Sequence, residues 1–246
     1  MSFVNKEREN EINLLLRDKY KGVKAEEFLK DVDRLSNGEP LAYVIGWVPF
    51  FGAKIYLDSK PLIPRTETEY LVSVIAKEIE NNGNRNMKIL DLCAGSGCIG
   101  ISLLKKFPSL KVDFAEIDES HHETIRRNLR ENNLDQNNSK IFGGDLFQNI
   151  PDSYDLIVSN PPYINPELSE RIGASVLEHE PKIALFGGKD GIEIINKILE
   201  QAPSHLNENG VLYLEHEPEQ VEHLSKNPMY IESIKDQYGV TRFSKF

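Results

Sequence analysis

The sequence predicts an α/β protein with a largely parallel sheet, and two observations support this fold class. From Thr66 onward, apolar runs alternate with amphipathic stretches of about 10–15 residues, the pattern of parallel strands joined by crossover helices. One apolar run, "KILDL", continues into a glycine-rich turn that opens the next helix, as in βαβ units that bind a ligand. A length of 246 residues allows one substantial domain and a small second one.

The first 64 residues divide into two parts. "EINLLLRDKY" and "AEEFLKDVDRL" carry apolar residues at helical spacing on either side of Gly22, and we expect two short helices that pack on another part of the chain. The next stretch is rich in Gly, Pro and aromatic residues, and "WVPFFG" with "AKIYLD" predicts a β-hairpin. We therefore expect a short helical N-terminal region at 1–37, a linker with a hairpin at 38–64 and the main domain at 65–246.

The main domain is predicted to follow one order of helices and strands. Each strand is an apolar run bounded by polar or turn-forming residues, and each helix is an amphipathic run. The expected elements are helix 67–82, strand 88–92, helix 98–107, strand 111–117, helix 119–133, strand 139–142, strand 154–159, helix 190–204, strand 210–215, helix 218–225, and closing strands near 229–234 and 241–245.

Composition excludes several classes of protein. With 29 basic and 39 acidic residues the net charge is −10, the wrong sign for a protein that neutralises many phosphates, so we expect no direct nucleic-acid partner. No apolar run approaches the roughly 18 residues of a membrane helix, and the N-terminus has no apolar signal region, so a cytoplasmic location is expected. Cys93 and Cys98 fit neither a disulfide framework nor a zinc knuckle. The adjacent His121 and His122 are expected at a solvated helix start. We therefore predict no metal site.

The glycine-rich turn predicts an adenosine cofactor. Glycines 95, 97 and 100 form a G-x-G-x-x-G pattern, and a second strand ends in Asp118 about 20 residues further on, where a carboxylate can bind both ribose hydroxyls. This combination fits either a nicotinamide dinucleotide or S-adenosylmethionine. Asp91, at the end of the first strand, favours S-adenosylmethionine, because an anion there repels a pyrophosphate but suits an ammonium or sulfonium group.

Other acids near the same sheet edge have alternative roles. Asp91 could instead be a capping or turn residue. Glu116 is expected to be a strand residue that faces solvent. Asp145 follows the third strand and is expected to recognise adenine, with Leu146 or Phe147 against the ring, because ligands of open α/β sheets bind at this edge.

The segment "LIVSNPPY" ends a buried strand with Asn160, Pro161, Pro162 and Tyr163. Proline has a fixed φ and restricts the residue before it, so the turn is rigid. The Asn160 side chain and the Pro161 carbonyl can then accept both hydrogens of an –NH₂ group, and Tyr163 can stack on a planar group. Methyl transfer to such a nitrogen needs orientation and fixed dipoles more than a strong base. The alternative is an ordinary strand-terminating turn.

These motifs resemble those of a known family. "DLCAGSGCIG", "AEIDES" and "NPPY", in this order, resemble class I S-adenosylmethionine-dependent methyltransferases that act on exocyclic or amide nitrogens. From about Gly38 to the C-terminus, "GEPLAYVIG", "LIPRTETEYLV", "EHEPKIALFGGKDG" and "DQYGVTRF" resemble the peptide chain release factor glutamine methyltransferases.

The resemblance implies a Rossmann-like class I methyltransferase sheet, mostly parallel with an antiparallel strand at the C-terminal end. It implies methylation of the side-chain amide nitrogen (N5) of the glutamine in the Gly-Gly-Gln loop of release factors, which modulates translation termination. S-adenosylmethionine is the implied donor and S-adenosylhomocysteine the product, and the N-terminal region is implied to help grip the release factor. We expect a monomer.

The resemblance also implies which residues form the site. The cofactor site would use Cys93, Ala94, Gly95, Ser96 and Gly97 for the loop, Asp118 for the ribose, Leu146 beside the adenine and Asn160 near the methyl donor. The glutamine would be held by Asn160, Pro161, Pro162 and Tyr163.

Several residues depart from the family pattern or allow two interpretations. The helical region before Gly38 is short, and Cys93, Ala94, Thr66, His216 and Glu217 replace residues that are more usual in the family. Arg65 and Glu67 either line the peptide groove or form an ion pair and helix cap, and Glu180 is expected to support the NPPY turn. The alternative functions are a nucleic-acid exocyclic-amine methyltransferase, a nicotinamide-dependent oxidoreductase and a non-catalytic binding scaffold.

Overall fold

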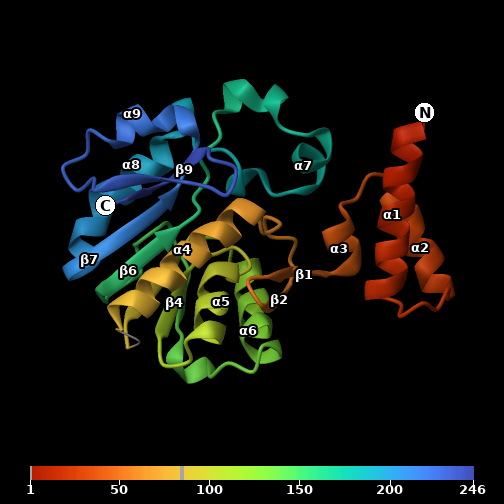
Figure 1. Cartoon of the computed structure of the whole chain (residues 1–246), viewed down its shortest axis with the longest axis horizontal. Coiled ribbons are helices and arrows are strands. Elements are labelled where there is room, and N and C mark those ends of the chain that lie inside the picture. The colour runs from red at the N-terminus through yellow and green to blue at the C-terminus, as the bar shows by residue number, and fades with distance from the viewer. Residues whose placement is uncertain (1, 84–85) are drawn as a thin grey trace.

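A seven-stranded sheet forms the centre of the part of the chain that the computed structural model describes, residues 2–83 and 86–246 (Figure 1). Its order is β5-β4-β3-β6-β7-β9-β8. The first five are parallel, whereas β9 runs antiparallel to both β7 and β8. The expected mostly parallel sheet with an antiparallel C-terminal end is confirmed. The strands are β3 (Lys88–Leu92), β4 (Lys111–Ala115), β5 (Ile141–Phe142), β6 (Tyr154–Ser159), β7 (Leu206–Glu215), β8 (Glu232–Lys235) and β9 (Thr241–Lys245).

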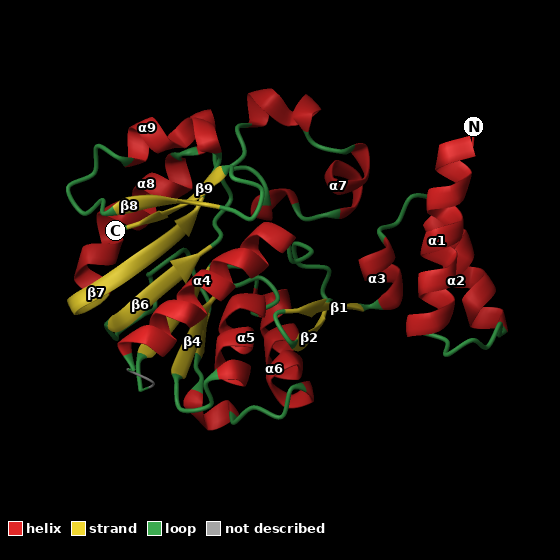
Figure 2. Ribbon diagram, viewed as in Figure 1, coloured by secondary structure: helices red, strands yellow, loops and turns green. Residues whose placement is uncertain are grey.

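Helices cover both faces of the sheet (Figure 2). On one face lie α4 (Thr66–Asn82), α5 (Cys98–Lys106) and α6 (His122–Glu131), and on the other α8 (Glu193–Gln201) and α9 (Val221–Leu224). Successive strand residues point to opposite faces, so Ile89 joins the core under α4 and α5 while Leu90 joins the core under α8. This explains why the central strands read as continuous apolar runs.

The order of the strands creates a ligand-binding crevice. Strand β3 pairs with β4 on one side and with β6 on the other. The chain thus leaves β3 toward β4 and β5, and then returns to the other side of β3 as β6. In open α/β sheets, ligands bind beyond the carboxyl ends of the strands at such a reversal. The loops that follow β3 and β6 are therefore the expected walls of a site.

The N-terminal region has its own small core. Helices α1 (Ser2–Asp18), α2 (Glu26–Ser36) and α3 (Leu41–Ile45) lie at one end of the protein. They enclose a cluster formed by Leu15, Phe28, Leu35 and Val44. The hairpin β1 (Trp47–Phe50) and β2 (Ala53–Tyr56) connects this region to the body, as expected. The boundaries 1–37, 38–64 and 65–246 remain predictions about independent domains.

The hairpin is attached to α6 by asparagine side chains. The Asn128 carboxamide accepts from Tyr56 N (2.7 Å) and donates to Tyr56 O (3.0 Å). One turn later, Asn132 makes the same pair of bonds to the backbone of Lys54 (3.1 and 2.8 Å). Two amides at i and i+4 on one helix face thus satisfy the free edge of β2.

Some elements differ from the sequence prediction. The predicted helix 119–133 is split into a 3₁₀ turn, Glu119–His121, and α6, and the predicted helix 190–204 is shortened to α8 between two 3₁₀ turns, Lys189–Gly191 and Ala202–His205. The sequence predicts no helix or strand between β6 and α8, but this segment forms short helices: η3 (Pro166–Arg171), α7 (Ala174–His179) and η4 (Lys182–Ala184). Helices this short depend on tertiary contacts, so periodicity does not reveal them. Further 3₁₀ turns are Gln136–Asn138 and Pro218–Gln220.

Among the described residues, no helix has the length and apolar character needed to cross a membrane.

Candidate active site

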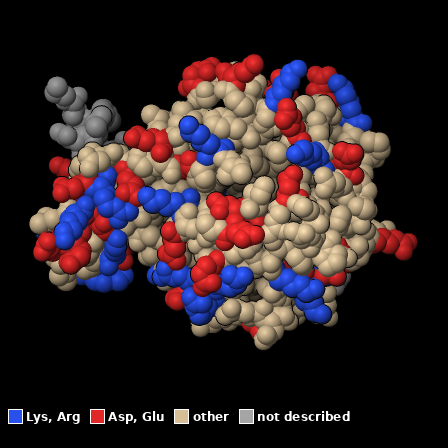
Figure 3. Space-filling model, turned by 180° about the vertical axis from the view of Figure 1, so that it is seen from behind, with Lys and Arg blue, Asp and Glu red and all other residues tan. Residues whose placement is uncertain are grey.

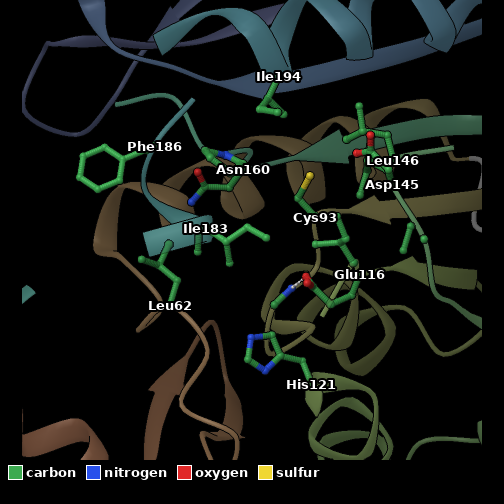
Figure 4. Close-up of a pocket in the computed structure, with 17 residues that line it drawn as sticks. Leu62, Cys93, Glu116, His121, Asp145, Leu146, Asn160, Ile183, Phe186 and Ile194 are labelled. Carbon is green, nitrogen blue, oxygen red and sulfur yellow. Dashed lines mark hydrogen bonds between the residues drawn. The ribbon is translucent and has the colours of Figure 1, made fainter. Parts of the chain in front are cut away.

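A cavity opens at the carboxyl ends of β3, β4 and β6 (Figure 4). Its wall combines the loop after β3, the end of β4, the loop after β5, the turn after β6 and the segment before α8. The residues that line it are Leu62, Leu92, Cys93, Gly95, Ala115, Glu116, Ile117, His121, Gly144, Asp145, Leu146, Asn160, Pro162, Ile183, Ala184, Phe186 and Ile194.

Glu116 is the buried acid of this cavity. It is only 7% exposed, which contradicts the expectation that it faces solvent. Its Oε2 accepts from Gly95 N (2.7 Å, dashed in Figure 4) and its Oε1 accepts from Asp118 N (2.8 Å). A carboxylate has about four acceptor positions, so two remain for the hydroxyls of a ligand. Glu116 thus ties the glycine loop to the end of β4 and presents negative charge to the cavity.

Asp118, in contrast, is absent from the described residues that line the cavity. Its side chain is 40% exposed, and its Oδ1 accepts from Ser120 N (2.9 Å) to cap the following 3₁₀ turn. Strand β4 ends at Ala115, so the first residue beyond the strand, Glu116, occupies the position predicted for Asp118. His121 was expected on a solvated helix start, but it is 4% exposed and lines the cavity, with Nδ1 2.8 Å from Ser59 Oγ.

The glycine loop contributes unequally to the wall. Cys93 and Gly95 line the cavity, whereas Ala94, Ser96 and Gly97 are not among the described residues of its wall. Burial raises the pKa of the Cys93 thiol to about 12, so it stays protonated. Gly97 has φ +75°, and a Cβ there would lie 3.1 Å from Ile101 Cδ1, so the loop needs glycine at this position.

Asp91 acts as a buried helix cap. Its Oδ2 accepts from Gly100 N (2.9 Å) in the first turn of α5, and it is not among the described residues of the wall. Burial raises its pKa to about 8, which the Glu116 charge reinforces. The structure therefore supports the capping alternative for Asp91, and its predicted contact with a cofactor remains untested.

The loop after β5 brings Asp145 and Leu146 to the cavity, and their expected contact with adenine stays a prediction. Leu146 adopts φ +50° and is buried, while Asp145 is half exposed and lies 3.6 Å from Lys197 Nζ. Phe147, the alternative to Leu146, instead stacks on His205 in the core below α8, with ring centroids 4.5 Å apart.

The NPPY turn lies between this cavity and a second one. Asn160 and Pro162 line the first cavity, and Asn160, Pro161 and Tyr163 line the second. The second cavity is completed by Leu62, Arg65, Ile164, Ile172, Val176, Ala184 and Leu185. Asn160 is therefore a residue that the two cavities share.

Arg65 and Glu180 hold the second cavity together. Arg65 Nη2 donates to Glu180 Oε1 (2.7 Å), and Glu180 Oε2 accepts from Ile63 N (2.9 Å). Arg65 lines the second cavity and forms an ion pair, although its partner is Glu180 and not Glu67. A contact of Arg65 with a peptide stays a prediction. Glu180 connects the residues before α4 to the end of α7. Its expected support of the NPPY turn stays a prediction.

A buried hydrogen-bond chain stands behind Asn160. Asn160 Nδ2 lies 3.0 Å from Thr68 Oγ1, Thr68 Oγ1 lies 2.7 Å from Glu215 Oε2, and Tyr163 Oη lies 3.0 Å from Glu215 Oε1. Burial raises the pKa of Glu215 to about 7 and that of Tyr163 well above its usual range. Sequence reasoning missed Thr68 and Glu215. The only available signal was a glutamate at the end of an apolar strand, in "LYLEHEP".

The cavity chemistry suits an uncharged or cationic adenosyl group. Its described wall includes Glu116 and Asp145 and no lysine or arginine, and otherwise contains mainly apolar side chains such as Ile117 and Leu146. A pyrophosphate needs positive partners, so a dinucleotide fits this wall poorly. Within residues 2–83 and 86–246, no group of three or more His, Cys, Asp or Glu side chains could hold a metal ion.

Comparison with known proteins shows which family and which enzymes the chain is similar to. The methyltransferase small domain family matches residues 66–189. The release factor glutamine methyltransferase of Streptococcus pneumoniae is 36% identical over 227 residues, which cover 88% of this chain and 78% of that protein. The enzyme of the same name from Lactococcus lactis is 37% identical over 201 residues, covering 82% of this chain and 72% of that protein.

Similarity to solved structures shows the fold. The T. thermophilus 16S rRNA N2 G1207 methyltransferase, solved in complex with AdoMet and guanosine, aligns with a TM-score of 0.56 at 18% identity. The alignment covers 81% of this chain and 48% of that chain.

Proposed function

Because the chain belongs to the release factor glutamine methyltransferase family, we propose that it methylates the side-chain amide nitrogen (N5) of a glutamine in a peptide chain release factor. The acceptor is the glutamine of the Gly-Gly-Gln loop, and the modification modulates translation termination. The proposed cytoplasmic location follows from such a partner.

The position of Asn160 is the observation that carries this proposal. Asn160 lies where an acidic, largely apolar cavity meets a second cavity lined by Arg65, Pro161 and Tyr163. A methyltransferase needs two adjoining sites, one for the methyl donor and one for the methyl acceptor, with the reacting atoms at their junction. An amide that is shared by both cavities can orient an acceptor nitrogen at that junction.

S-adenosylmethionine is the proposed donor, and it supplies the methyl group on an activated sulfonium. Glu116 would accept hydrogen bonds from the ribose hydroxyls, Gly95 permits close approach of the loop backbone, and Ile117 and Leu146 would pack against the adenine, with Asp145 at its edge. The contributions of Asp91, Asp118, Ala94, Ser96 and Gly97 are expected to be indirect, through the shape of the loop.

The acceptor glutamine would be held by the NPPY turn. The Asn160 side-chain oxygen and the Pro161 carbonyl would accept the two amide hydrogens, and Tyr163 and Pro162 would contact the planar amide. Accepting both hydrogens turns the nitrogen lone pair toward the donor cavity and favours the pyramidal geometry of the transition state. The methyl–nitrogen bond forms as the methyl–sulfur bond breaks, and the surplus amide proton is lost to solvent.

A nucleic-acid exocyclic amine is the alternative acceptor. The NPPY turn suits any planar –NH₂ group, but the net charge of −10 opposes a nucleic-acid partner. The named relatives also favour glutamine. The monomeric state and the role of the N-terminal helices in gripping the release factor remain predictions.

Transfer of radiolabelled methyl from S-adenosylmethionine to a purified release factor tests the proposal. A Gly-Gly-Ala variant of the factor and a duplex oligonucleotide are assayed in parallel. We expect label on the wild-type factor alone. Label on the oligonucleotide, with none on the factor, would establish the alternative acceptor instead.

The same assay tests the role of Asn160. The Asn160→Ala enzyme should lose about a hundredfold or more in kcat, because it removes one of the two acceptors that orient the nitrogen. Asn207→Ala is a matched control, since Asn207 is an exposed asparagine near the start of β7 whose amide bonds only Asp155 (2.8 Å) among the described residues. Its rate should equal that of the wild type.

A further inference from the structure

The Asn160 carboxamide can face the cavity in two ways, and its neighbours decide which. Its Nδ2 and Oδ1 branches have nearly the same shape, but one donates hydrogen bonds and the other accepts them. An acceptor –NH₂ group requires the oxygen to face it. With the nitrogen in that place, two –NH₂ groups would point their hydrogens at each other.

The hydrogen-bond chain behind Asn160 has only one consistent direction when Glu215 is ionised. A carboxylate accepts hydrogen bonds and cannot donate them, so the Thr68 hydroxyl must donate to Glu215 Oε2 across 2.7 Å. With its hydrogen used in this way, Thr68 Oγ1 can only accept from Asn160, across 3.0 Å. The Asn160 branch next to Thr68 must therefore be the nitrogen. The Oδ1 branch has no hydrogen-bond partner among the described residues.

On this basis, and resting on the function proposed above, we propose that Thr68 and Glu215 are positioning residues that hold the Asn160 carboxamide with its oxygen toward the acceptor nitrogen. Thr68, on α4, is 2% exposed, and Glu215, at the end of β7, is 1% exposed, so water does not compete for these bonds. Neither residue is in the wall of either cavity. Tyr163, which donates to the other oxygen of Glu215 (3.0 Å), connects the same carboxylate to the NPPY turn a second time.

Protonation of Glu215 reverses the chain. A proton on Oε2 makes Glu215 a donor to Thr68, and the Thr68 hydroxyl then donates to Asn160, which must turn its oxygen away from the acceptor. Burial raises the Glu215 pKa to about 7, and the negative charge of Glu67 on α4 adds to this increase. The hydrogen bonds from Thr68 and Tyr163 lower the Glu215 pKa, as does the positive charge of Arg242, which lies on β9. Methyl transfer should therefore decline as the pH falls through this range.

The decisive comparison removes the Thr68 hydroxyl without changing its shape. We expect Thr68→Val to lower kcat toward the release factor by about tenfold or more, because the Asn160 carboxamide is free to turn. Thr68→Ser retains the hydroxyl and should restore most of the rate. Ser102→Ala is the control for loss of a buried hydroxyl, since Ser102 Oγ donates to Phe50 O (3.1 Å) and is not among the described residues of either cavity. Thermal unfolding of each variant verifies that it is folded.

A pH profile separates this role from a purely structural one. Wild-type kcat should show an acid limb near pH 7. The limb should be lost in Glu215→Gln, which has no titrating group, and in Thr68→Val, which has no hydroxyl to pass the change on to Asn160. Carbon-13 NMR of the Glu215 carboxyl should show a higher pKa in Thr68→Val without any turnover, because the lost hydrogen bond had stabilised the carboxylate.

Two results would overturn the positioning role while leaving the proposed function intact: a Thr68→Val enzyme with wild-type kcat on the release factor, or an acid limb that Glu215→Gln does not alter. A wild-type enzyme that labels no release factor would instead refute the proposed function. The NMR titration would then still decide whether Thr68 and Glu215 are coupled as described, since an unchanged Glu215 pKa in Thr68→Val refutes that coupling.

Discussion

Glu116 and Asp118 lie two positions apart, but only Glu116 reaches the wall of the cavity. We predict that Glu116→Gln weakens binding of S-adenosylmethionine by about tenfold or more, because the buried carboxylate loses one of its acceptor oxygens. Asp118→Asn should change the affinity about twofold or less, since its side chain caps an exposed turn. Isothermal titration calorimetry measures both. If Asp118→Asn has the larger effect, the assignment of the ribose contact to Glu116 is wrong.

Asp91 gives the second prediction at the scale of one residue. Its pKa is about 8 in the folded protein and about 4 in an unfolded chain, so the folded state binds the proton more tightly. Its contribution to stability is therefore fully present below about pH 4 and is lost as the pH rises toward about 8. We expect the thermal midpoint of the wild type to fall between about pH 6 and pH 8.5 more steeply than that of Asp91→Asn.

The matched control for this titration is Asp58→Asn, because Asp58 is an exposed aspartate that pairs with Arg127 on the protein surface. It should keep the wild-type slope of midpoint against pH. Equal slopes for the wild type and Asp91→Asn would contradict a raised pKa at Asp91.

At the scale of elements, α5 packs unusually close to β4. A Cβ at Gly100 would lie 2.5 Å from Phe114 Cε1 and 2.7 Å from Val112 Cγ1, so the third glycine of the loop motif has a packing role. We predict that Gly100→Ala lowers the free energy of unfolding by about 1–3 kcal/mol through overpacking. Denaturant unfolding measures this change.

Gly173→Ala is the control for that substitution. Gly173 has φ −58°, and a Cβ there would meet no described atom within 4 Å. Its effect should stay within about 0.5 kcal/mol. A similar loss in both variants would contradict an origin in the contact between α5 and β4, since the backbone-entropy effect of replacing Gly by Ala favours the folded state.

The segment between β6 and α8 shows how elements assemble the site. Its short helices are connected to the residues before α4 by the Arg65–Glu180 ion pair, and a backbone bridge between Ile164 and Phe186 joins the two ends of the segment to each other. These contacts join residues that are far apart in the sequence. The segment can therefore form a wall of both cavities even though it lacks the periodicity of a long helix.

At the scale of the whole molecule, charge predicts the behaviour of the partner complex. The chain carries a net charge of −10, and acidic and basic side chains alternate over the face seen in Figure 3. Release factors are expected to expose basic, RNA-facing surfaces, so long-range attraction should assist their association with this protein.

We therefore predict that the KM for the release factor rises about threefold or more between about 50 mM and 300 mM salt, because salt screens this attraction. Steady-state kinetics measures it, with the affinity for S-adenosylmethionine as the control, since a contact inside a cavity is screened much less. A salt-independent KM would show that net charge has no part in recognition of the factor.

Much of the fold and part of the site were predictable from local patterns. Apolar runs located β3 and β6, the glycine pattern located the loop at 93–97, and the prolines located the turn at Asn160. Cys93, Gly95, Asp145, Leu146, Asn160 and Pro162, which were predicted site residues, do line the first cavity. These features are encoded in neighbouring residues, because strand ends, glycine turns and proline restrictions act over a few positions.

Only the tertiary structure decided which side chains reach the site from beyond those motifs. The end of β4 determined that Glu116, and not Asp118, lines the cavity, because the strand stops at Ala115 and Asp118 already caps the 3₁₀ turn that follows. Thr68 and Glu215 are 147 positions apart and meet only because α4 packs over the end of β7. The sequence alone determined the sheet, the glycine-rich loop and the NPPY turn, whereas the buried hydrogen-bond chain behind Asn160 depends on how distant elements pack.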